Sequence, residues 1–517
     1  MRIECTLADF KSLAAEYQVI PVLARLPITT QTPLATYLNL KVAEQPSFLF
    51  ESADSSSKSG RYSLLGGKSH WVLKSYADSM QITDCETGAS EDIPLDPESP
   101  QADVLQVLES TLSIYGAVAP IAEDLPFYGG AVGYISYEAV QQFEPTVTIN
   151  KQDDLQVLRG CFFLADEVVV FDHEQQEIFL VVQAFLQEGD DLDAVYTEIE
   201  QRFKQLEQTL LATQALPAIE PNLEYTIPQA HSNTTQEQYE AMVNKVKEYI
   251  LAGDVFQTVP SQRFSLPYEN SPQDLYRALR QINPSPYMFI LDLEDYCLVG
   301  SSPEVHVRLT NKRIDIRPIA GTRWRGQSEA EDLALEQDLL ADEKERAEHL
   351  MLVDLARNDV GRMAEPGSVK VDDFMIIERY SHVMHLVSNV SGTLAEGKTA
   401  FDILKSTFPA GTVSGSPKIR AMQIIGEIEQ AQRGAYSGAV GYFAWNGNHD
   451  SCIALRTCLI KDEQVYVQAG AGVVADSNPT YEYEETCNKA KGMFKAVALA
   501  KAIAQLESKK GKEDSSC

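Results

Sequence analysis

Short apolar runs rich in β-branched residues follow one another through the second half of the chain, mostly without a helix between them. Parallel strands need a long crossover connection, usually a helix, whereas antiparallel strands can be joined directly. The pattern therefore predicts antiparallel sheets rather than a doubly wound parallel sheet, and an α+β fold. Helices are predicted over Gln236–Ala252 and Ala330–Asp359. The predicted strands are Tyr287–Val299, Val305–Leu309, Arg313–Ile319, Val383–Val390, Ala439–Trp445, Ile453–Ile460 and Gln464–Ala469.

The first half, up to about residue 210, has the pattern of mixed helix and strand. The predicted helices are Leu7–Tyr17 and Asp191–Thr213, and the predicted strands are Ser47–Phe50, His70–Tyr76, Cys161–Phe171 and Glu177–Phe185, the last two as a hairpin. Residues 214–235 are rich in Pro, Asn, Ser and Thr and carry no long periodic run. A boundary between an N-terminal domain (1–225) and a C-terminal domain (226–507) is expected there. The tail 508–517 is expected to be disordered.

Net charge and cysteine spacing exclude several classes of protein. The chain has 517 residues and a formal net charge of −32, which argues against binding nucleic acid or an anionic membrane. A local cluster of cations still allows a small anionic substrate. No apolar stretch is long enough to span a bilayer, and the N-terminus lacks the pattern of a signal peptide. The eight scattered cysteines, without a Cys-x-x-Cys spacing, suit reduced thiols in a cytoplasmic protein.

One short sequence occurs twice. Gly-Ala-Val-Gly-Tyr occupies residues 130–134 and again residues 438–442. A strand relieved by glycine could produce such a match by chance. The alternative is a duplicated architecture, in which each half of the chain contributes an equivalent strand. The sequence leaves both interpretations open.

Two Glu-x-x-Glu pairs, Glu345/Glu348 and Glu482/Glu485, carry the most specific chemical signal. If both segments are helical, the three-residue spacing places each pair on one helix face. In an arbitrary acidic chain, such pairs usually belong to solvated helix faces. Here the first pair leads into an apolar stretch, and the second follows a glycine turn and precedes Lys489. Four carboxylates brought together repel one another unless a cation lies between them, which a hard divalent ion would satisfy.

The glycine turn, Gly470-Ala-Gly472-Val-Val-Ala475, formally fits the Gly-x-Gly-x-x-Ala fingerprint of dinucleotide-binding folds. That fingerprint needs a helix that begins within the turn, so that the helix N-terminus meets the pyrophosphate. Here residues 476–479 intervene, and a helix is expected only from about Thr480. Nucleotide binding is therefore rejected. The backbone N–H groups of the turn are expected to face a carboxylate instead.

Three arginines, Arg317, Arg323 and Arg325, lie within nine residues at the end of a predicted strand. Their forked guanidinium groups suit bidentate contacts with the carboxylates of a small polyanionic substrate. Ion pairing with the acidic helix that follows is an equally ordinary role. The sequence does not decide between the two.

Several long motifs occur in a fixed order, and together they resemble the chorismate-utilising enzymes, most closely the large subunits of anthranilate synthases. The resemblance runs from about Gln236 to Ala500 and extends more weakly into the first half. It implies two orthogonally packed antiparallel sheets flanked by helices. It also implies Mg²⁺-dependent amination of chorismate and loss of pyruvate to give anthranilate, the first step of tryptophan biosynthesis. The motifs are 318–323 (Pro-Ile-Ala-Gly-Thr-Arg), 348–359 (Glu-His-Leu-Met-Leu-Val-Asp-Leu-Ala-Arg-Asn-Asp), 411–415 (Gly-Thr-Val-Ser-Gly), 438–442 (Gly-Ala-Val-Gly-Tyr) and 468–472 (Gln-Ala-Gly-Ala-Gly).

The resemblance also implies roles for individual residues. Mg²⁺ would hold the ring carboxylate of chorismate, with Glu348 and Glu485 as direct ligands and Glu345 and Glu482 beside them. The substrate pocket would be lined by Gly321, Thr322, Gly470, Ala471, Gly472 and Lys489, with Tyr442 and Arg456 on the enolpyruvyl carboxylate.

Three further residues would carry the chemistry. Glu304 would protonate the departing ring hydroxyl, and His385 would assist removal of the ring proton when pyruvate leaves. Thr412 is implied as a further contact.

Two positions distinguish this chain from other members of the family. Aminodeoxychorismate synthases usually carry a nucleophilic Lys where this chain has Ala320, and isochorismate and salicylate synthases carry a Lys general base where it has Gln257. Neither replacement can do this chemistry, so ammonia is the expected attacker. Trp324 replaces the family's usual Pro, a departure expected to alter loop stiffness and not the chemistry. No Gly-x-Cys-x-Gly nucleophile turn surrounds any cysteine, which implies a separate glutamine amidotransferase subunit as ammonia source.

The first half carries an implied effector site. Residues 48–52, Phe-Leu-Phe-Glu-Ser, resemble the family's Leu-Leu-Glu-Ser motif, and residues 283–288 match its companion segment. Inhibition by L-tryptophan is therefore implied, although two phenylalanines in place of leucines change the size of the pocket. The alternative is that residues 48–50 form only a core strand. The implied contacts are Glu51, Ser52, Pro286, Tyr287 and Met288.

Overall fold

The computed structural model describes residues 1–53, 58–95, 103–220, 223–380 and 383–514. The first half contains β1 (Arg2–Ile3), α1 (Leu7–Leu13), β2 (Val19–Pro27), α2 (Pro33–Leu40), β3 (Ser47–Glu51), β4 (Tyr62–Gly66), β5 (Ser69–Ser75), β6 (Ser79–Asp84), β7 (Ser90–Pro94), α3 (Val104–Ser113), β8 (Gly130–Ile135), α4 (Val140–Phe143), β9 (Gly160–Ala165), β10 (Glu167–Asp172), β11 (Glu177–Phe185) and α5 (Leu192–Ala212), with short 3-10 turns at Lys58–Arg61 and Tyr137–Ala139.

The second half begins after a stretch, 213–220 and 223–230, that holds neither helix nor strand. It contains β12 (His231–Ser232), α6 (Gln236–Ala252), β13 (Gln257–Thr258), β14 (Ser261–Pro267), α7 (Pro272–Ile282), β15 (Tyr287–Asp292), β16 (Cys297–Ser302), β17 (Val305–Thr310), β18 (Arg313–Ile316), β19 (Ile319–Trp324), α8 (Glu329–Ala341), α9 (Glu343–Gly361), β20 (Lys370–Arg379), β21 (Val383–Thr393), α10 (Ala400–Thr407), α11 (Gly411–Ser414), β22 (Gly415–Ser416), α12 (Lys418–Ile428), β23 (Ala439–Ala444), β24 (His449–Ile453), β25 (Thr457–Lys461), β26 (Gln464–Gly470) and α13 (Pro479–Asp514).

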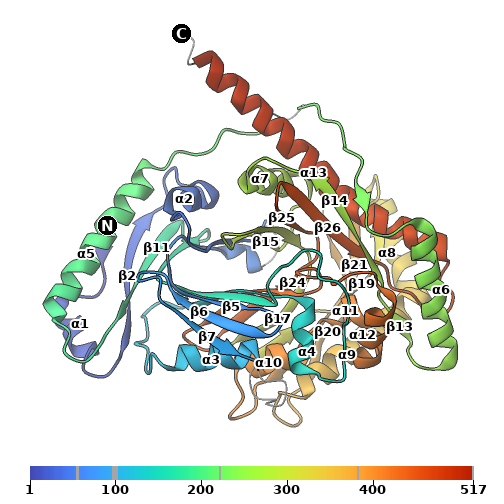
Figure 1. The fold of residues 1–517 in the computed structure, drawn as a ribbon, viewed down its shortest axis with the longest axis horizontal. Helices are drawn as coiled ribbons and strands as arrows, with labels where there is room; N and C mark the ends of the chain where they lie inside the picture. The colour runs from blue at the N-terminus through green and yellow to red at the C-terminus, as the bar shows by residue number, and fades with distance from the viewer. Residues whose placement is uncertain (54–57, 96–102, 221–222, 381–382, 515–517) are drawn as a thin grey trace.

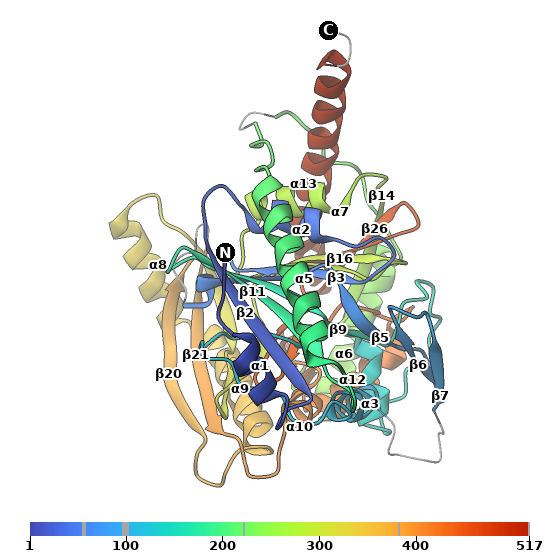
Figure 2. The same cartoon turned by 90° about the vertical axis from the view of Figure 1, so that its left-hand side faces the viewer.

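Two antiparallel sheets of 12 strands each pack orthogonally face to face, with helices on both outer faces (Figure 1). One sheet has the order β1-β2-β11-β10-β4-β3-β15-β16-β25-β26-β14-β12, and the other has β19-β21-β18-β17-β24-β23-β8-β9-β5-β6-β7, with β20 paired to β21. Helices α2, α5, α7 and α13 cover the first sheet, and α3, α9, α10 and α12 cover the second. Figure 2 shows α5 lying across β2 and β11. The α+β fold with antiparallel sheets is confirmed.

Most strands of the first sheet are buried on both faces, because their alternating side chains enter two different cores. Along β10, Val169 and Phe171 pack under the helices, while Val168 and Val170 enter the core between the two sheets. This arrangement explains why the strand segments are continuously apolar in the sequence rather than alternating with polar residues.

The strand order reveals an internal duplication. Read outward from the centre of the first sheet, one side runs β3, β4, β10, β11, β2, β1 and the other runs β15, β16, β25, β26, β14, β12. Each position thus holds strands that come at equivalent points in the two halves of the chain. In the second sheet the repeated Gly-Ala-Val-Gly-Tyr segments become β8 and β23, which pair directly, with Gly133 opposite Gly441. Duplication, one of the two interpretations of the repeat, is the one the structure supports.

The duplication also bears on the expected domains. Each sheet takes strands from both halves of the chain, so the halves on either side of residue 225 share two sheets and the core between them. The stretch without helix or strand lies where the boundary was expected. Helix α13 continues to Asp514 and therefore includes residues 508–514 of the segment expected to be disordered. Lys and Glu in this segment are good helix formers, which favours continuing the helix. Residues 515–517 lie outside the described residues.

Several predicted elements are interrupted where the chain must turn. The strand expected over Tyr287–Val299 is the hairpin β15–β16, and the one expected over Ile453–Ile460 is split into β24 and β25. The helix expected over Ala330–Asp359 breaks at Asp342, whose side chain accepts hydrogen bonds from the first backbone N–H groups of α9. Such an N-cap begins a new helix. The strand expected over Cys161–Phe171 is split into β9 and β10, which belong to different sheets, and only β10 forms the predicted hairpin with β11. By contrast, α6 has the predicted bounds.

Two further expectations from composition can be compared with the structure. The seven cysteines within the described ranges are all free, in agreement with the expected reduced thiols. In the same ranges, none of the helices has both the length and the apolar character needed to cross a bilayer.

Replacing Gly441 by Ala tests the central strand pair. A Cβ at this position would lie 2.1 Å from the backbone oxygen of Asp450, so the strands must separate, and we expect a loss of about 1–3 kcal/mol or more. The matched control is Gly492→Ala in α13, where a Cβ meets no atom within 4 Å and Ala favours the helix. The thermal unfolding midpoint should fall for Gly441→Ala and stay or rise for Gly492→Ala. Equal midpoints would contradict the close approach.

Candidate active site

The two acid pairs lie on helices α9 and α13, which belong to opposite layers of the fold. Because α9 starts anew after Asp342, Glu345 and Glu348 occupy its first two turns and face glycine positions of other elements. A Cβ placed on Gly321 would lie 3.2 Å from Oε2 of Glu345, and one placed on Gly472 would lie 3.8 Å from Oε1 of Glu348. The first pair therefore borders both β19 and the turn after β26.

Gly321 fits its position for a backbone reason. Its φ of 67° lies in the left-handed region that only glycine adopts at little cost. The residue sits at an irregularity in the pairing of β19 with β21, between Ala320 and Thr322. This irregularity leaves Thr322 directly opposite His385.

Helix α13 begins at Pro479, as expected from the rejection of a nucleotide site, and brings the second pair to the same turn. Lys489 donates to the backbone oxygen of Gly470 at 3.0 Å and forms an ion pair with Glu485 at 2.8 Å. Desolvation by the neighbouring protein would lower the pKa of the half-exposed Lys489 ammonium, but the carboxylate of Glu485 outweighs this effect and the pKa is raised. Lys489 is therefore a fixed positive charge beside the glycine turn.

Burial and mutual repulsion act on the acids themselves. Burial raises the pKa of Glu345, and the neighbouring Glu348 adds to the rise. Burial likewise raises the pKa of Glu482, with Glu485 as a further cause. Carboxylates with raised pKa values gain most from a nearby cation.

The donor set suits a hard cation such as Mg²⁺, because it offers only carboxylate oxygens. Among the described residues, however, no three acidic, His or Cys side chains come close enough together to hold a metal ion. Two of the acids have other partners. Glu348 accepts a hydrogen bond from Gln257 at 3.1 Å, and Glu485 forms an ion pair with Lys489. Holding one ion would require these flexible side chains to turn toward one another.

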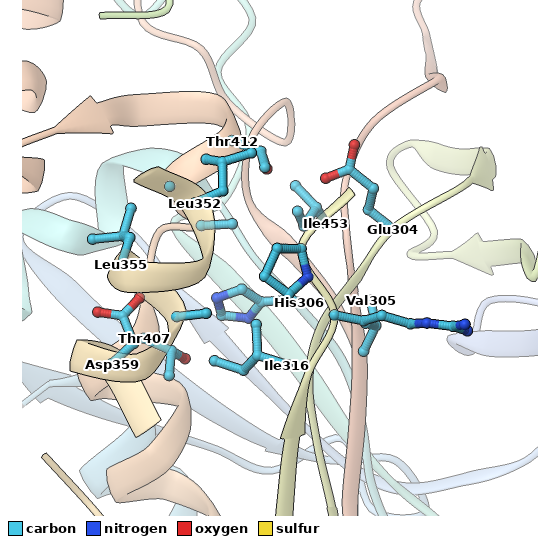
Figure 3. A pocket seen from close by; sticks show the side chains of 15 residues that line it. Glu304, Val305, His306, Ile316, Leu352, Leu355, Asp359, Thr407, Thr412 and Ile453 are labelled. Atoms are coloured by element: carbon cyan, nitrogen blue, oxygen red, sulfur yellow. The ribbon is translucent and has the colours of Figure 1, made fainter. Parts of the chain in front are cut away.

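Glu304 lies between β16 and β17, with its carboxyl group near Thr412 (Figure 3). Burial raises its pKa, while the Thr412 hydroxyl and the positive charges of Arg456 and Lys489 oppose the rise without cancelling it. Its backbone oxygen accepts a hydrogen bond from Ile453 at 3.1 Å. A held carboxyl group with a raised pKa is suited to donate a proton.

His385 on β21 has the opposite tendency. Burial lowers the pKa of its imidazole, and Arg456 lowers it further, although a contact with the Gly321 backbone opposes them. The ring is therefore neutral at pH 7. Its Nδ1 lies 3.0 Å from the Gly321 oxygen and 3.0 Å from Oγ1 of Thr322. Because a carbonyl can only accept, Nδ1 carries the proton, and Nε2 remains free to act as a base.

One predicted residue lies elsewhere. Tyr442 is buried in the core between the sheets, where its charged neighbours are Asp450 and Arg308, so it does not face Lys489. Strand alternation is the reason, because β23 directs Tyr442 inward. Tyr436, which precedes the strand, lies at the site instead: a Cβ placed on Gly470 would lie 2.9 Å from its hydroxyl. Tyr436 lies two residues before the repeated Gly-Ala-Val-Gly-Tyr segment, which itself ends in Tyr442, and the sequence did not indicate which of the two reaches the site.

A buried ion pair supports this tyrosine. The guanidinium of Arg433 makes two hydrogen bonds to Glu429, and it also donates to the backbone oxygens of Val259 and Val413. Its side chain is 1% exposed. Glu429 in turn accepts from the backbone and hydroxyl of Ser261. The network fixes the segment before β23 against the strands of the site, and sequence reasoning missed it.

The first half of the chain completes this network. Glu138 accepts hydrogen bonds from the backbone N–H groups of Arg433 and Gly434 at 2.6 and 3.0 Å, and the Tyr137 ring lies 4.6 Å from the guanidinium carbon. The segment that carries Tyr436 is therefore held from both halves of the duplicated fold.

The three arginines near β19 pair with protein carboxylates. Arg323 contacts Asp338 and Asp342 at 2.7 and 2.8 Å, and Arg325 contacts Asp332 at 2.8 Å. Arg317 pairs with Glu378 on β20. Of the two roles that the sequence left open, ion pairing is the one observed.

The residues implied for the effector site lie on two paired strands, but their side chains point to opposite faces of the sheet. Strands β3 and β15 pair with Met288 opposite Glu51. Glu51 accepts from Tyr276 and faces a groove of about 410 Å³ on the helix side, whereas Tyr287 donates to Asp450 at 2.9 Å between the sheets. Side chains of these residues therefore cannot all line one pocket. Phe48 is fully buried, so residues 48–50 do form a core strand.

Comparison with known proteins places this geometry in a family. The family model described as chorismate binding enzyme matches residues 46–495. The chain is 45% identical over 503 residues to anthranilate synthase component 1 of Aquifex aeolicus. This match covers 97% of this chain and 99% of that protein. It is 46% identical to the protein of the same name from Pseudomonas putida, over 95% of this chain and 98% of that one. The chain belongs to the chorismate binding enzymes, in the group of anthranilate synthase component 1.

Two solved structures share the fold of this chain. Anthranilate synthase component I from Streptococcus pneumoniae matches with a TM-score of 0.72 at 36% identity, over 90% of this chain and 97% of that one. The menaquinone-specific isochorismate synthase of Escherichia coli matches with a TM-score of 0.68 over 94% of this chain and 98% of that one. At 18% identity, the second match supports the fold alone.

Replacing Arg433 by Met tests the buried pair in this chorismate binding enzyme. Removing one partner leaves the Glu429 carboxylate buried and unpaired, so we expect the free energy of unfolding to fall by about 3–5 kcal/mol. The control is Lys245→Met, which removes an exposed pair with Glu248 and should cost less than about 1 kcal/mol. Denaturant titration measures both.

A double variant makes the test specific. Adding Glu429→Gln to Arg433→Met removes the unpaired charge and should recover part of the loss. Additive losses in the double variant would show that the two side chains are not coupled.

Proposed function

We propose that the chain is the chorismate-converting subunit of an anthranilate synthase, which adds ammonia to chorismate and then eliminates pyruvate. The observation that carries the proposal is the grouping of an acid, a base and a fixed cation, Glu304, His385 and Lys489, beside two pairs of carboxylates. The names of the relatives, anthranilate synthase component 1 from several bacteria, support the same product.

The substrate is a dianion, and the site offers separate partners for its two carboxylates. Arg456 and Tyr436 would hold the enolpyruvyl carboxylate, with Lys489 and the backbone of Gly470–Gly472 close to the ring. Arg456 is suited to this because the only hydrogen bond of its guanidinium among the described residues is a long one, 3.4 Å, to Asn283. A guanidinium without a close carboxylate partner can bind a carboxylate in two places at once.

The acid pairs would hold Mg²⁺ in the proposed site. Glu348 and Glu485 would be direct ligands, with Glu345 and Glu482 around them. When bound, Mg²⁺ would neutralise the ring carboxylate, so that electron density can shift across the diene. The raised pKa values of Glu345 and Glu482 support a cation at this place.

The residues of the chain would carry the proton transfers in two steps. In the first, the lone pair of ammonia forms the C–N bond while the C–O bond to the ring hydroxyl breaks. Glu304 protonates the hydroxyl, which leaves as water, and the new ammonium group then returns one proton to the Glu304 carboxylate. In the second, Nε2 of His385 accepts the ring proton as the enolpyruvyl C–O bond breaks. The enolate of pyruvate leaves and takes the proton from the His385 imidazolium to become pyruvate, and the ring becomes aromatic.

The choice of ammonia over water rests on two side chains. Gln257 lies against Glu348 with its amide and cannot deprotonate a water molecule. Ala320 cannot act as a covalent nucleophile. Ammonia needs no base to become nucleophilic, so it is the attacker that this site can use.

Two partners complete the proposal. A separate glutamine amidotransferase would supply ammonia. The relatives are named component 1, which agrees with the existence of a second component. L-tryptophan would act as a feedback inhibitor at the β3–β15 pair. Because Glu51 and Tyr287 point to opposite faces there, the inhibitor would contact the side chains of one face and the backbone of the other segment. The hydroxyl of Ser52, buried without a hydrogen-bond partner among the described residues, is available for such a contact.

Replacing Glu348 by Gln tests the metal assignment. Loss of a ligand charge should lower anthranilate formation at least about 100-fold and raise the Mg²⁺ concentration needed for half activity. The assay follows anthranilate fluorescence with chorismate, ammonium and varied Mg²⁺. Glu343→Gln, an exposed acid on the same helix, should behave like the unaltered protein. Undiminished activity of Glu348→Gln would refute the assignment.

The pH dependence tests His385 as the base. Because its pKa is lowered from 6.5, the active neutral form persists as the pH falls, and activity should decline only below pH 6.5. The measurement is kcat/KM for chorismate between pH 5 and 8, at a fixed concentration of un-ionised ammonia. In His385→Gln the rate should fall about 10²–10⁴-fold, and the acid limb should vanish. A limb centred above pH 6.5, or one that survives the substitution, would exclude this role.

A further inference from the structure

Behind Glu304 lies a partly open cavity of about 40 Å³ that the steps above do not use (Figure 3). It is bounded by α9, by the end of α10 and α11, and by β17 and β18. At one end it shares Glu304 and Thr412 with the candidate active site. Most of the remaining wall is apolar, formed by Ile316, Leu352, Leu355, Ala356 and Ile453.

His306 is the principal polar side chain that faces this cavity. The residue is 3% exposed, and neither ring nitrogen makes a hydrogen bond of normal geometry within the described structure, although the nearby backbone of Thr407 acts to raise its pKa. Its ring meets Phe408 edge to face, with centroids 5.9 Å apart. Burial, and then the charge of Lys418, lower the pKa of His306 to about 3, so the imidazole is neutral at physiological pH. It therefore presents one N–H donor and one nitrogen acceptor.

The other polar groups at the far end are already paired. Lys418 donates to Asp359 at 2.7 Å and to the backbone oxygen of Thr407 at 2.8 Å. A buried donor or acceptor without a partner costs about 1–3 kcal/mol. The unmet hydrogen bonding of His306 thus calls for a molecule about the size of water that can both donate and accept.

We propose that this cavity is a subsite for ammonia, held by His306 as a neutral molecule beside Glu304 before it attacks the ring. Ammonia has three donors and one acceptor, which complement the two nitrogens of a neutral imidazole. An ammonium ion would lose its hydration against the apolar wall, and the carboxylate of Asp359, which also lines the cavity, is already neutralised by its ion pair with Lys418. No bond forms or breaks in the cavity itself. The inference rests on the proposed function and adds to it the place where the nitrogen donor waits.

The test is a kinetic comparison of the whole protein with ammonium as donor. His306→Phe keeps an aromatic ring against Phe408 but removes both nitrogens. We expect KM for ammonium to rise about 10-fold, the fold-change for one lost hydrogen bond of about 1.4 kcal/mol, with KM for chorismate unchanged. The matched control is His449→Phe, another buried histidine whose pKa is lowered to about 3 but which does not line the cavity.

A second variant works through volume alone. Ala356→Val adds methyl groups at the α9 wall without touching His306 or the residues assigned to catalysis, and it should also raise KM for ammonium. If KM for ammonium stays unchanged in both variants, the cavity holds only water and the inference is wrong. A fall in kcat with both KM values unchanged would likewise reject it in favour of a structural role. Failure of the unaltered protein to form anthranilate would instead remove the proposed function, and the subsite with it.

Discussion

The pairing of β8 with β23 is the contact on which the rest of the structure depends. Gly133 and Gly441 face one another there, and a Cβ on either would lie about 2 Å from the backbone oxygen of the next strand. This close approach joins the two halves of the duplicated chain in one sheet, and the β3–β15 pair does the same in the other. From β23 the chain continues through β24, whose Ile453 N–H holds the backbone of Glu304. The position of Glu304 therefore depends on the central strands of the second sheet.

The same physical effect prepares the proposed acid and base for opposite tasks. Burial disfavours the charged form of any group, so it keeps the carboxyl group of Glu304 protonated more readily and the imidazole of His385 neutral. Ion pairs hold most of the cations near the site. Lys489 pairs with Glu485 near the glycine turn. The three arginines near β19 pair with acids of α8, the α8–α9 junction and β20. Arg456, by contrast, forms no ion pair among the described residues, so its charge is available where a dianionic substrate would bind.

Sequence reasoning succeeded where a local pattern decides the outcome. The bounds of α6, the hairpin of β10 and β11, and the start of α13 at Pro479 follow from periodicity, turn residues and helix-start signals. It failed where apolar periodicity continues through a turn. The segments 287–299 and 453–460 are apolar on both sides of their breaks, so each was predicted as one strand. The charged residues Asp292, Glu294 and Asp295 mark the first turn, and the second break is where Arg456 adopts a φ of 46°. The interruption at Asp342 shows the same limit for helices.

The sequence by itself determined the fold class, the presence of two acid pairs on helix faces and the family to which the chain belongs, because motifs and spacing are local properties. Only the tertiary structure decided that Tyr436 and not Tyr442 reaches the site, that Arg433 and Glu429 support it from within, and that His306 faces a cavity. These facts depend on which face of a strand meets which layer and on contacts between residues far apart in the chain. No pattern within a single segment records them, since burial and pairing are set by the packing of the two halves.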